Sequence, residues 1–289
     1  MSDYIIATDA DSELILPYVL EKGIAVFPMP LTLNGVEYNY DLGKTVQIPD
    51  FFEQIENGAT VSTSCKSPWE IKQWFLELLE QGKDILYIGF SHNLSQHFGN
   101  CQMAVQEIRE EKPDAPRIFL VDTLSISAGQ SLLIRKAVAL KEQGKPIEEV
   151  AQWLEANKQH SLVFFSVDDL NYLKRGGRLS GGAAFFGTVL DLKPILHTSE
   201  DGRLEPIEKI KGRKKAWRRM AELVKERGVD LEENEILLLY TNQDDAKVME
   251  ANLQELCHPK SIEFWPVGPV IGGHAGPRVM GLACWGTER

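Results

Sequence analysis

Several features that mark common protein classes are missing from this sequence. Its 289 residues include only four cysteines and six histidines. No two cysteines form a C-x-x-C pair and no histidine stands near one at zinc-ligand spacing, which favours reduced core thiols over a zinc site. Neither G-x-x-x-x-G-K-S/T nor G-x-G-x-x-G occurs, so no nucleotide loop is expected. We therefore predict no metal and no cofactor. The cysteines are Cys65, Cys101, Cys257 and Cys284.

Long apolar runs and an excess of positive charge are missing as well. No window reaches the roughly 18 to 20 apolar residues that span a bilayer. The N-terminal stretch MSDYIIATDADSELI has no basic region followed by an apolar segment, as a secretion signal would. The formal net charge is −11, which argues against non-specific binding to nucleic acid. A cytoplasmic protein without a nucleic-acid partner is the expectation.

The first half of the chain alternates short apolar runs with stretches of helical periodicity. This rhythm is typical of βαβ units and a mainly parallel sheet. Ser67-Pro68-Trp69-Glu70 has the residue types of a capping box, so a helix is expected from Pro68 to about Gln81. The predicted strands are Tyr4–Thr8, Ile24–Pro28, Ile85–Phe90 and Arg117–Val121. The other predicted helices are Ser95–Glu111, Ser125–Gly144 and a segment that ends near His160.

The second half shows a different pattern. Ser161–Ser166 is a predicted strand, and the runs Leu192–Thr198 and Arg203–Ile210 flank Ser199-Glu200-Asp201-Gly202, which has the composition of a hairpin turn. Helix and strand then alternate through Trp217–Trp265. The sequence therefore predicts a two-domain α/β protein, with a mainly parallel N-terminal domain at 1–160 and a mixed α/β domain at 161–289.

Ser91 follows the apolar run Ile85–Phe90, where α/β hydrolases place a nucleophilic serine. The hydrolase turn has the form G-x-S-x-G, whereas Asn93 stands at the last position here. Asp122 and His274 would complete a serine, acid and base order, although so many acidic residues make such orders easy to find by chance. Two hypotheses stay open: a serine hydrolase that acts on an acyl substrate with Ser91 as nucleophile, and a turn that holds a carboxylate.

Hydroxyl and acidic residues stand at two other predicted element ends. Thr63 and Ser64 precede the helix that begins at Pro68, where hydroxyls and helix N-terminal amides can donate to an anion. Asp122 and Thr123 end a strand, and ligands of open α/β sheets lie outside the carboxyl ends of the strands. Local helix capping is the alternative for both groups.

Two glycine-rich segments favour different interpretations. Leu173–Gly182 lacks the spacing of a phosphate loop, so its small residues are interpreted as a place where another segment passes close to the backbone. Gly268–Gly281 surrounds His274 with glycines and prolines. A histidine in so rigid a setting is typical of a site rather than of a core.

Lys209–Arg219 holds seven basic residues in eleven. On an acidic protein, a solvated helix face is the simplest interpretation of such a stretch. A docking surface for an acidic partner is the alternative.

Six motifs, taken together and in order, resemble those of the DegV family. The resemblance extends over essentially the whole chain. It implies a two-domain α/β fold with a tunnel between the domains that binds a long-chain fatty acid. It also implies a carrier that is not itself an enzyme and that presents the carboxylate to an ATP-binding fatty acid kinase subunit, which forms an acyl-phosphate. The motifs are Thr63-Ser64, Ser91-His92-Asn93-Leu94-Ser95, Asp122-Thr123, Gly176-Gly177-Arg178, Lys193-Pro194-Ile195-Leu196 and GPVIGGHAGP at 268–277.

Position by position, the resemblance implies a carboxylate-binding set and a tunnel wall. Burying an isolated carboxylate is costly, and hydroxyls and imidazoles can supply several donors to it. The implied carboxylate-binding residues are Thr63, Ser64, Ser91, His92, Ser95 and His274. The implied tunnel-lining residues are Phe185, Phe186, Val189 and Leu190.

The sequence departs from the family pattern at four places. These departures support a third hypothesis, a carrier or sensor of a different small ligand. The basic stretch Lys209–Arg219 is the predicted contact for the kinase subunit or, transiently, for a membrane. The departures are His92 in place of a serine, Gln96 and His97 in place of Gly-Thr, TDADSEL, which keeps Asp9 but lacks Asp-Ser-Thr, and Arg278 in place of a glycine.

Overall fold

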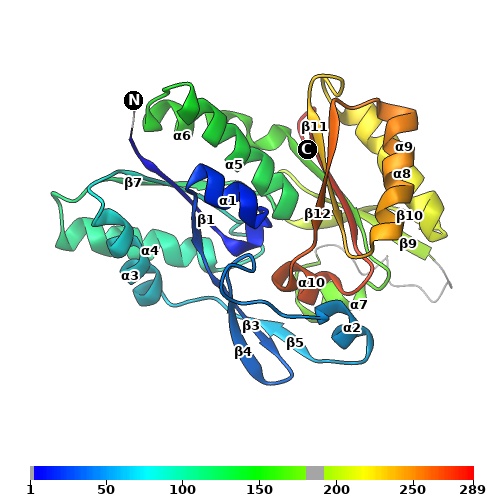
Figure 1. Cartoon of the computed structure of the whole chain (residues 1–289), viewed down its shortest axis with the longest axis horizontal. Helices are drawn as coiled ribbons and strands as arrows, with labels where there is room; N and C mark the ends of the chain where they lie inside the picture. Colours follow the sequence, from blue (N-terminus) through cyan, green and yellow to red (C-terminus); the bar gives the residue numbers. More distant parts are fainter. Residues whose placement is uncertain (1–2, 180–191) are drawn as a thin grey trace.

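The computed structural model describes residues 3–179 and 192–289 (Figure 1). Its N-terminal half contains a four-stranded parallel sheet with the strand order β2-β1-β6-β7. Helices α3 and α4 lie on one side of this sheet, and α5 and α6 on the other (Figure 1). The strands are β1 (Ile5–Asp9), β2 (Ala25–Phe27), β6 (Ile85–Gly89) and β7 (Ile118–Asp122). The helices are α1 (Leu16–Lys22), α3 (Pro68–Leu79), α4 (His97–Glu111), α5 (Ser127–Glu142) and α6 (Ile147–Asn157).

The predicted capping box of α3 is present. The backbone N–H of Glu70 donates to Ser67 Oγ, and the backbone N–H of Ser67 donates to Glu70 Oε2. Pro68 occupies the first helical turn, where no N–H partner is needed. A cap of this kind stabilises a helix by about 1 kcal/mol. The cap fixes where helix α3 begins, a few residues after Thr63 and Ser64.

A small antiparallel sheet, ordered β4-β3-β5, was not expected from the sequence. Asn34 and Gly35 make its hairpin turn, and both have positive φ angles, as a tight two-residue hairpin requires. The buried residues Leu31, Leu33 and Phe51 belong to a separate apolar cluster. The sheet consists of β3 (Met29–Leu33), β4 (Val36–Tyr40) and β5 (Val61–Thr63), and helix α2 (Phe51–Glu56) packs nearby.

The C-terminal half forms a six-stranded mixed sheet with the order β10-β9-β8-β13-β11-β12. Only the β11–β12 pair is parallel, and the predicted hairpin at 199–202 joins β9 to β10. The strands are β8 (Ser161–Ser166), β9 (Leu192–Thr198), β10 (Leu204–Lys211), β11 (Glu235–Tyr240), β12 (Ser261–Pro266) and β13 (Met280–Trp285). The helices are α7 (Asn171–Arg175), α8 (Arg213–Arg227), α9 (Gln243–Cys257) and α10 (Pro269–Ala275).

Helix α5 lies between the two large sheets. It contacts β1 and β6 of the parallel sheet, and also β8, β11 and β13 of the mixed sheet. Buried residues occur on all sides of it, among them Leu132, Leu133 and Ile134. The largest apolar cluster therefore includes residues of both halves, such as Ile88 and Leu239.

The predicted α/β fold, with a mainly parallel N-terminal sheet and a mixed C-terminal sheet, is confirmed. Strand β8, which begins at Ser161, is the first strand in the sequence that belongs to the mixed sheet. The division into domains at residue 160 stays a prediction, since α5 belongs to the core of both halves. Within residues 3–179 and 192–289, no helix is long and apolar enough to cross a membrane.

Candidate ligand-binding site

A mainly apolar cavity lies where the two halves meet. It contains about 910 Å³ of empty space, its opening to solvent included. The lining comes from the six-stranded mixed sheet, from the small antiparallel sheet, from the loop after β6, from the start of α5 and from α10. Aliphatic and aromatic side chains provide most of this lining: Met29, Phe90, Leu94, Ile126, Val163, Phe165, Leu173, Leu204, Leu239, Val267, Val270, Ile271 and Val279.

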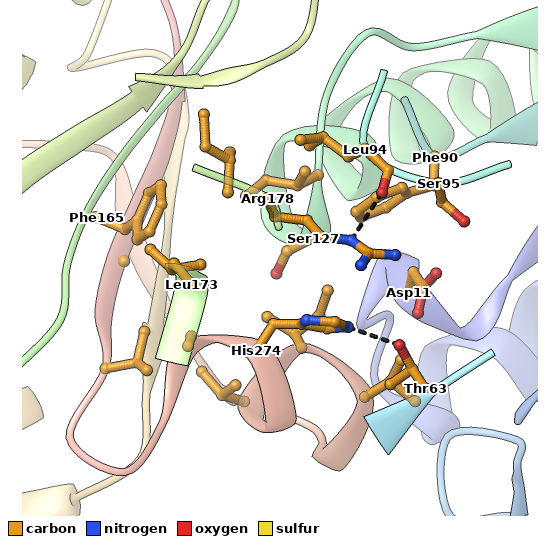
Figure 2. A pocket seen from close by; sticks show the side chains of 18 of the residues that line it. Asp11, Thr63, Phe90, Leu94, Ser95, Ser127, Phe165, Leu173, Arg178 and His274 are labelled. Carbon is orange, nitrogen blue, oxygen red and sulfur yellow. Dashed lines mark hydrogen bonds between the residues drawn. The ribbon is translucent and has the colours of Figure 1, made fainter. Parts of the chain in front are cut away.

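Polar side chains gather at one end of this cavity, which we call the head-group end (Figure 2). They come from six separate chain segments, so only the folded chain brings them together. A mainly apolar pocket with a few convergent polar groups is the usual form of a site for an amphipathic ligand. The head-group end consists of Asp11, Thr63, Ser64, Ser95, Ser127, Arg178 and His274.

His274 is held in place by close packing on several sides. Its Nε2 lies 2.6 Å from Thr63 Oγ1, and a Cβ on Gly176 would come within 2.4 Å of its Nδ1. Gly273, its neighbour in α10, packs against Val61. Burial, with a smaller effect from the Arg178 charge, lowers the pKa of His274 to about 4. The imidazole is therefore neutral at pH 7 and can share one hydrogen bond with Thr63.

Arg178 places a positive charge at the head-group end. Its Nε donates to the carbonyl of Leu94, and its Nη1 donates to the carbonyl of Gly176. Among the described residues it forms no ion pair. A guanidinium fixed by backbone carbonyls but without a counter-ion is well suited to bind a carboxylate. Arg178 belongs to the Gly176-Gly177-Arg178 motif but is not among the predicted carboxylate-binding residues.

A second, more polar pocket reaches the head-group end from outside. Thr63, Arg178 and His274 line both this pocket and the apolar cavity. The other lining residues include Ser62 and Arg175, whose guanidinium lies over the ring of Tyr172. Three side chains of the head-group end therefore also border this outer pocket.

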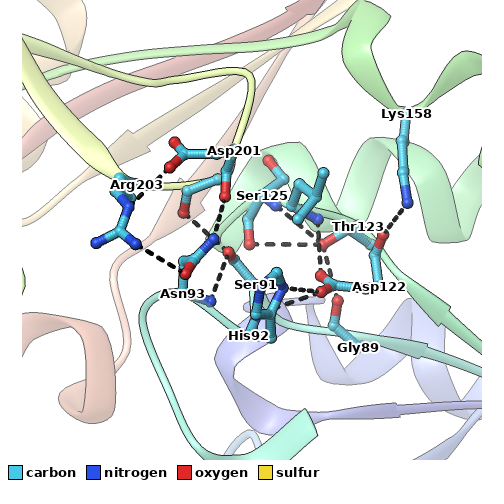
Figure 3. A network of polar contacts seen from close by, with 12 residues as sticks. Gly89, Ser91, His92, Asn93, Asp122, Thr123, Ser125, Lys158, Asp201 and Arg203 are labelled. Carbon is cyan, nitrogen blue, oxygen red and sulfur yellow. Dashed lines mark hydrogen bonds and ion pairs between the residues drawn. The ribbon is translucent and has the colours of Figure 1, made fainter. Parts of the chain in front are cut away.

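Four of the six predicted carboxylate-binding residues, Thr63, Ser64, Ser95 and His274, line the cavity. Ser91 and His92 do not. The hydroxyl of fully buried Ser91 donates to the carbonyl of Gly202, which belongs to the β9–β10 turn (Figure 3). His92 points away to the surface, with 52% of its side chain exposed, and its Nδ1 lies 2.5 Å from Asp122 Oδ2. Ser91 therefore lies in a contact between the two halves, and His92 in a surface pair within the N-terminal half, rather than in the cavity.

The residues of the hydrolase hypothesis are not assembled. Ser91 is bonded to Gly202, Asp122 to His92, and His274 to Thr63. A nucleophilic serine needs a base within hydrogen-bond reach, and no histidine nitrogen accepts from Ser91 among the described residues. This geometry disfavours Ser91 as a nucleophile.

The departures from the family pattern mostly lie away from the cavity. Gln96 lies with His92 in a separate surface pocket, and His97 is buried in the core beside Phe27. Arg278 pairs with Glu56 and Asp245 at distances of 3.5 and 3.6 Å. In the TDADSEL segment, however, Asp11 lines the head-group end. The predicted tunnel residues Phe185, Phe186, Val189 and Leu190 lie outside the described residues.

Three arginines of the basic stretch Lys209–Arg219 are paired with neighbouring acids. Arg213 binds Asp168, Arg218 binds Glu255, and Arg219 binds Glu208 and Glu226. The aromatic residue in the stretch, Trp217, is buried. Its role as a contact for a kinase subunit or a membrane stays a prediction.

Comparison with known proteins assigns the family. The sequence model described as "Uncharacterised protein, DegV family" matches residues 4–286. The chain belongs to the DegV family. A DegV domain-containing protein of Clostridium perfringens is 32% identical to it over 277 residues, which cover 96% of this chain and 95% of that protein. One from Streptococcus pyogenes is 31% identical over 280 residues and covers 96% of both chains.

Solved DegV family structures have the same fold. A Thermus thermophilus protein, described as a fatty-acid-binding DegV family protein, superposes with a TM-score of 0.86 at 28% identity, over 98% of this chain and 99% of that one. DegV of Bacillus subtilis, described as a fatty acid binding protein, gives a TM-score of 0.81 at 26% identity, over 99% and 100% of the two chains.

Proposed function

We propose that this DegV family protein binds a long-chain fatty acid, with the acyl chain in the apolar cavity and the carboxylate at the head-group end. The observation that carries the proposal is the guanidinium of Arg178, which forms no ion pair within the part of the chain that the structure describes and lines a mainly apolar cavity. The fatty-acid-binding relatives of Thermus thermophilus and Bacillus subtilis, which share this fold along the whole chain, support it.

The two ends of the ligand contribute differently to its affinity. Burial of a chain of ordinary fatty-acid length contributes roughly 10 kcal/mol at about 0.8 kcal/mol per methylene. Each charge-assisted hydrogen bond to the carboxylate adds about 1.5–3 kcal/mol. Arg178 and Thr63 offer such donors at the head-group end. The acyl chain thus supplies most of the affinity, and the head group sets which way the ligand lies.

The protein is proposed to be a carrier rather than an enzyme. The polar pocket beside Thr63, Arg175 and Arg178 leaves the carboxylate reachable from outside. A separate ATP-binding fatty acid kinase subunit that docks over this pocket would phosphorylate the carboxylate and form an acyl-phosphate. The carrier supplies orientation and exclusion of water from the chain, and the partner supplies the nucleotide. Cytoplasmic localisation and transient membrane contact during ligand exchange belong to the same proposal.

Mass spectrometry of lipid extracted from the purified protein tests the binding proposal. We expect one acyl chain per protein molecule, and rebinding of added palmitate after delipidation. The absence of any acyl chain together with no binding of palmitate would reject fatty-acid binding. Recovery of a different small molecule in stoichiometric amount would favour the carrier or sensor of another ligand. Incubation with a fatty acid kinase subunit and ATP tests acyl-phosphate formation separately.

A further inference from the structure

Asp11 has a carboxyl group at the head-group end with an unsatisfied oxygen. It belongs to the short 3-10 helix η1 (Ala10–Ser12) and lies at the same end of the cavity as Arg178 and His274 (Figure 2). Asp11 is only 4% exposed, and its Oδ1 is buried without a hydrogen-bond partner among the described residues. A buried carboxylate without donors is costly, whereas a protonated carboxyl group needs one acceptor for its O–H. A ligand could therefore provide the hydrogen-bond partner that the Asp11 carboxyl group lacks.

The two neighbouring buried acids are satisfied by the protein itself. Asp9 and Glu13 flank Asp11 in the sequence, and neither lines the cavity. Each accepts at least two hydrogen bonds from other parts of the fold. The donors are Tyr87 Oη and the backbone N–H of Phe90 for Asp9, and Ser127 Oγ and the backbone N–H of Gly268 for Glu13. Among these three acids, Asp11 is therefore the one that faces the ligand.

The surroundings of Asp11 oppose its ionisation. Burial raises the pKa of Asp11 well above its ordinary value, and the charges of Asp9 and Glu13 raise it further, while Arg178 lowers it. From the other elements that line this end of the cavity, His274 presents a neutral imidazole and Cys65 a thiol. A ligand carboxylate beside Arg178 would bring a second negative charge close to Asp11. Two carboxylates that share a buried site do not both remain ionised.

We propose that Asp11 is a specificity-determining residue: it retains a proton and donates it in a hydrogen bond to the carboxylate of the bound fatty acid. This inference rests on the fatty-acid binding proposed above. Arg178 then faces one negative charge, which the two carboxyl groups share through the proton. The site consequently selects a head group that can accept a hydrogen bond, and it disfavours a cationic one.

A shared proton makes binding depend on pH in one direction. While free Asp11 is protonated, a fatty-acid anion binds without a change in protonation. Above the pKa of free Asp11, binding must take up one proton, so affinity falls by up to about tenfold per pH unit. An asparagine at position 11 donates through its amide without titrating. Asp11→Asn should therefore bind with an affinity that stays constant over the same pH range.

Calorimetric titration of the delipidated full chain with dodecanoate, a soluble fatty-acid anion, tests this inference. Buffers of different ionisation enthalpy report the number of protons taken up at each pH. We expect wild-type uptake to rise toward one proton as the affinity falls, and both effects to disappear in Asp11→Asn. Asp11→Ser provides the same test if the asparagine variant does not fold.

Glu13→Gln is the matched control, because it makes the same carboxyl-to-amide change at a buried acid outside the cavity. Burial raises the pKa of Glu13 to about 8, so Glu13 is the main competing source of a proton. Proton uptake that persists in Asp11→Asn, or that disappears in Glu13→Gln instead, would overturn the role of Asp11.

The remaining outcomes separate this inference from the proposed function. Binding of dodecanoate with no dependence on pH would reject the shared proton and leave fatty-acid binding intact. No binding of dodecanoate by any variant at any pH would reject both. Tighter binding of dodecylamine than of dodecanoate would show that Asp11 acts as an ionised counter-ion, and would also overturn the inference.

Discussion

The head-group end of the cavity and the turn around Ser91 contain the same kinds of side chain, but they differ in what their polar groups contact. At the turn, Ser91 is bonded to Gly202, and Asn93 to Asp201 (Figure 3). At the head-group end, among residues 3–179 and 192–289, Arg178 forms no ion pair and Asp11 has a buried oxygen without a donor. Polar groups that satisfy one another hold the structure together, whereas groups left unsatisfied beside a cavity indicate where a ligand binds.

Substitution of Arg178 should have the largest effect on ligand binding. Arg178→Gln removes the charge that faces the carboxylate, and the loss of one partner of a buried charge pair costs about 2–5 kcal/mol. We expect affinity for palmitate to fall by at least about 30-fold in a direct titration. Arg175→Gln is the matched control, since Arg175 lines only the outer pocket. Equal losses in the two variants would remove the distinction between cavity and outer pocket.

Ser91→Ala should show the opposite pattern, with an effect on stability and none on binding. The variant leaves the Gly202 carbonyl without its donor, which costs about 1–3 kcal/mol for a buried group. Chemical denaturation measures this loss. Gly202→Ala should destabilise the same contact, because its Cβ would lie 2.4 Å from Ser91 Oγ. If the folded Ser91→Ala variant binds palmitate more weakly than wild type, Ser91 contacts the ligand after all.

His274→Ala should separate ligand retention from phosphoryl transfer. Loss of one hydrogen bond at the head-group end lowers affinity for palmitate by about 0.5–1.5 kcal/mol, because the acyl chain is untouched. Misplacement of the carboxylate lowers the rate of kinase-coupled acyl-phosphate formation more than it lowers retention. Parallel assays of palmitate titration and acyl-phosphate production measure the two effects. A proportional loss in both would mean that His274 acts through affinity alone.

His92→Ala should have the smallest effect. The His92–Asp122 pair is half exposed on the histidine side, and pairs of this kind contribute about 0–1 kcal/mol. Thermal unfolding and palmitate affinity should both stay close to wild type. A tenfold change in affinity would contradict the assignment of the Ser91 turn as a purely structural contact.

The sequence predicted the helices and strands better than it predicted the directions in which individual side chains point. The strand at Ser161–Ser166 and the α3 capping box could be predicted because apolar period and cap chemistry are local. The β3–β4 hairpin was not predicted, although its Asn34-Gly35 turn is a strong hairpin signal.

The candidate site was predicted in part for a similar reason. Residues near strand ends could be named, but which of them face the cavity depends on contacts made by distant segments. Ser91 turns away because Gly202, more than a hundred positions later, occupies its hydroxyl. Asp11 and Arg178 are far apart in the sequence, and only the fold brings them to the same end of the cavity. No local sequence pattern could indicate that they would lie together.

The placement of α5 between the two sheets has a consequence for how the molecule unfolds. Because Leu132, Leu133 and Ile134 are buried by both halves, neither sheet can be released without exposing this helix to water. The chain should therefore unfold in a single cooperative transition, and a fragment that begins at Ser161 should not fold alone. A ligand, by the same reasoning, must exchange through local opening near the cavity rather than through separation of the halves.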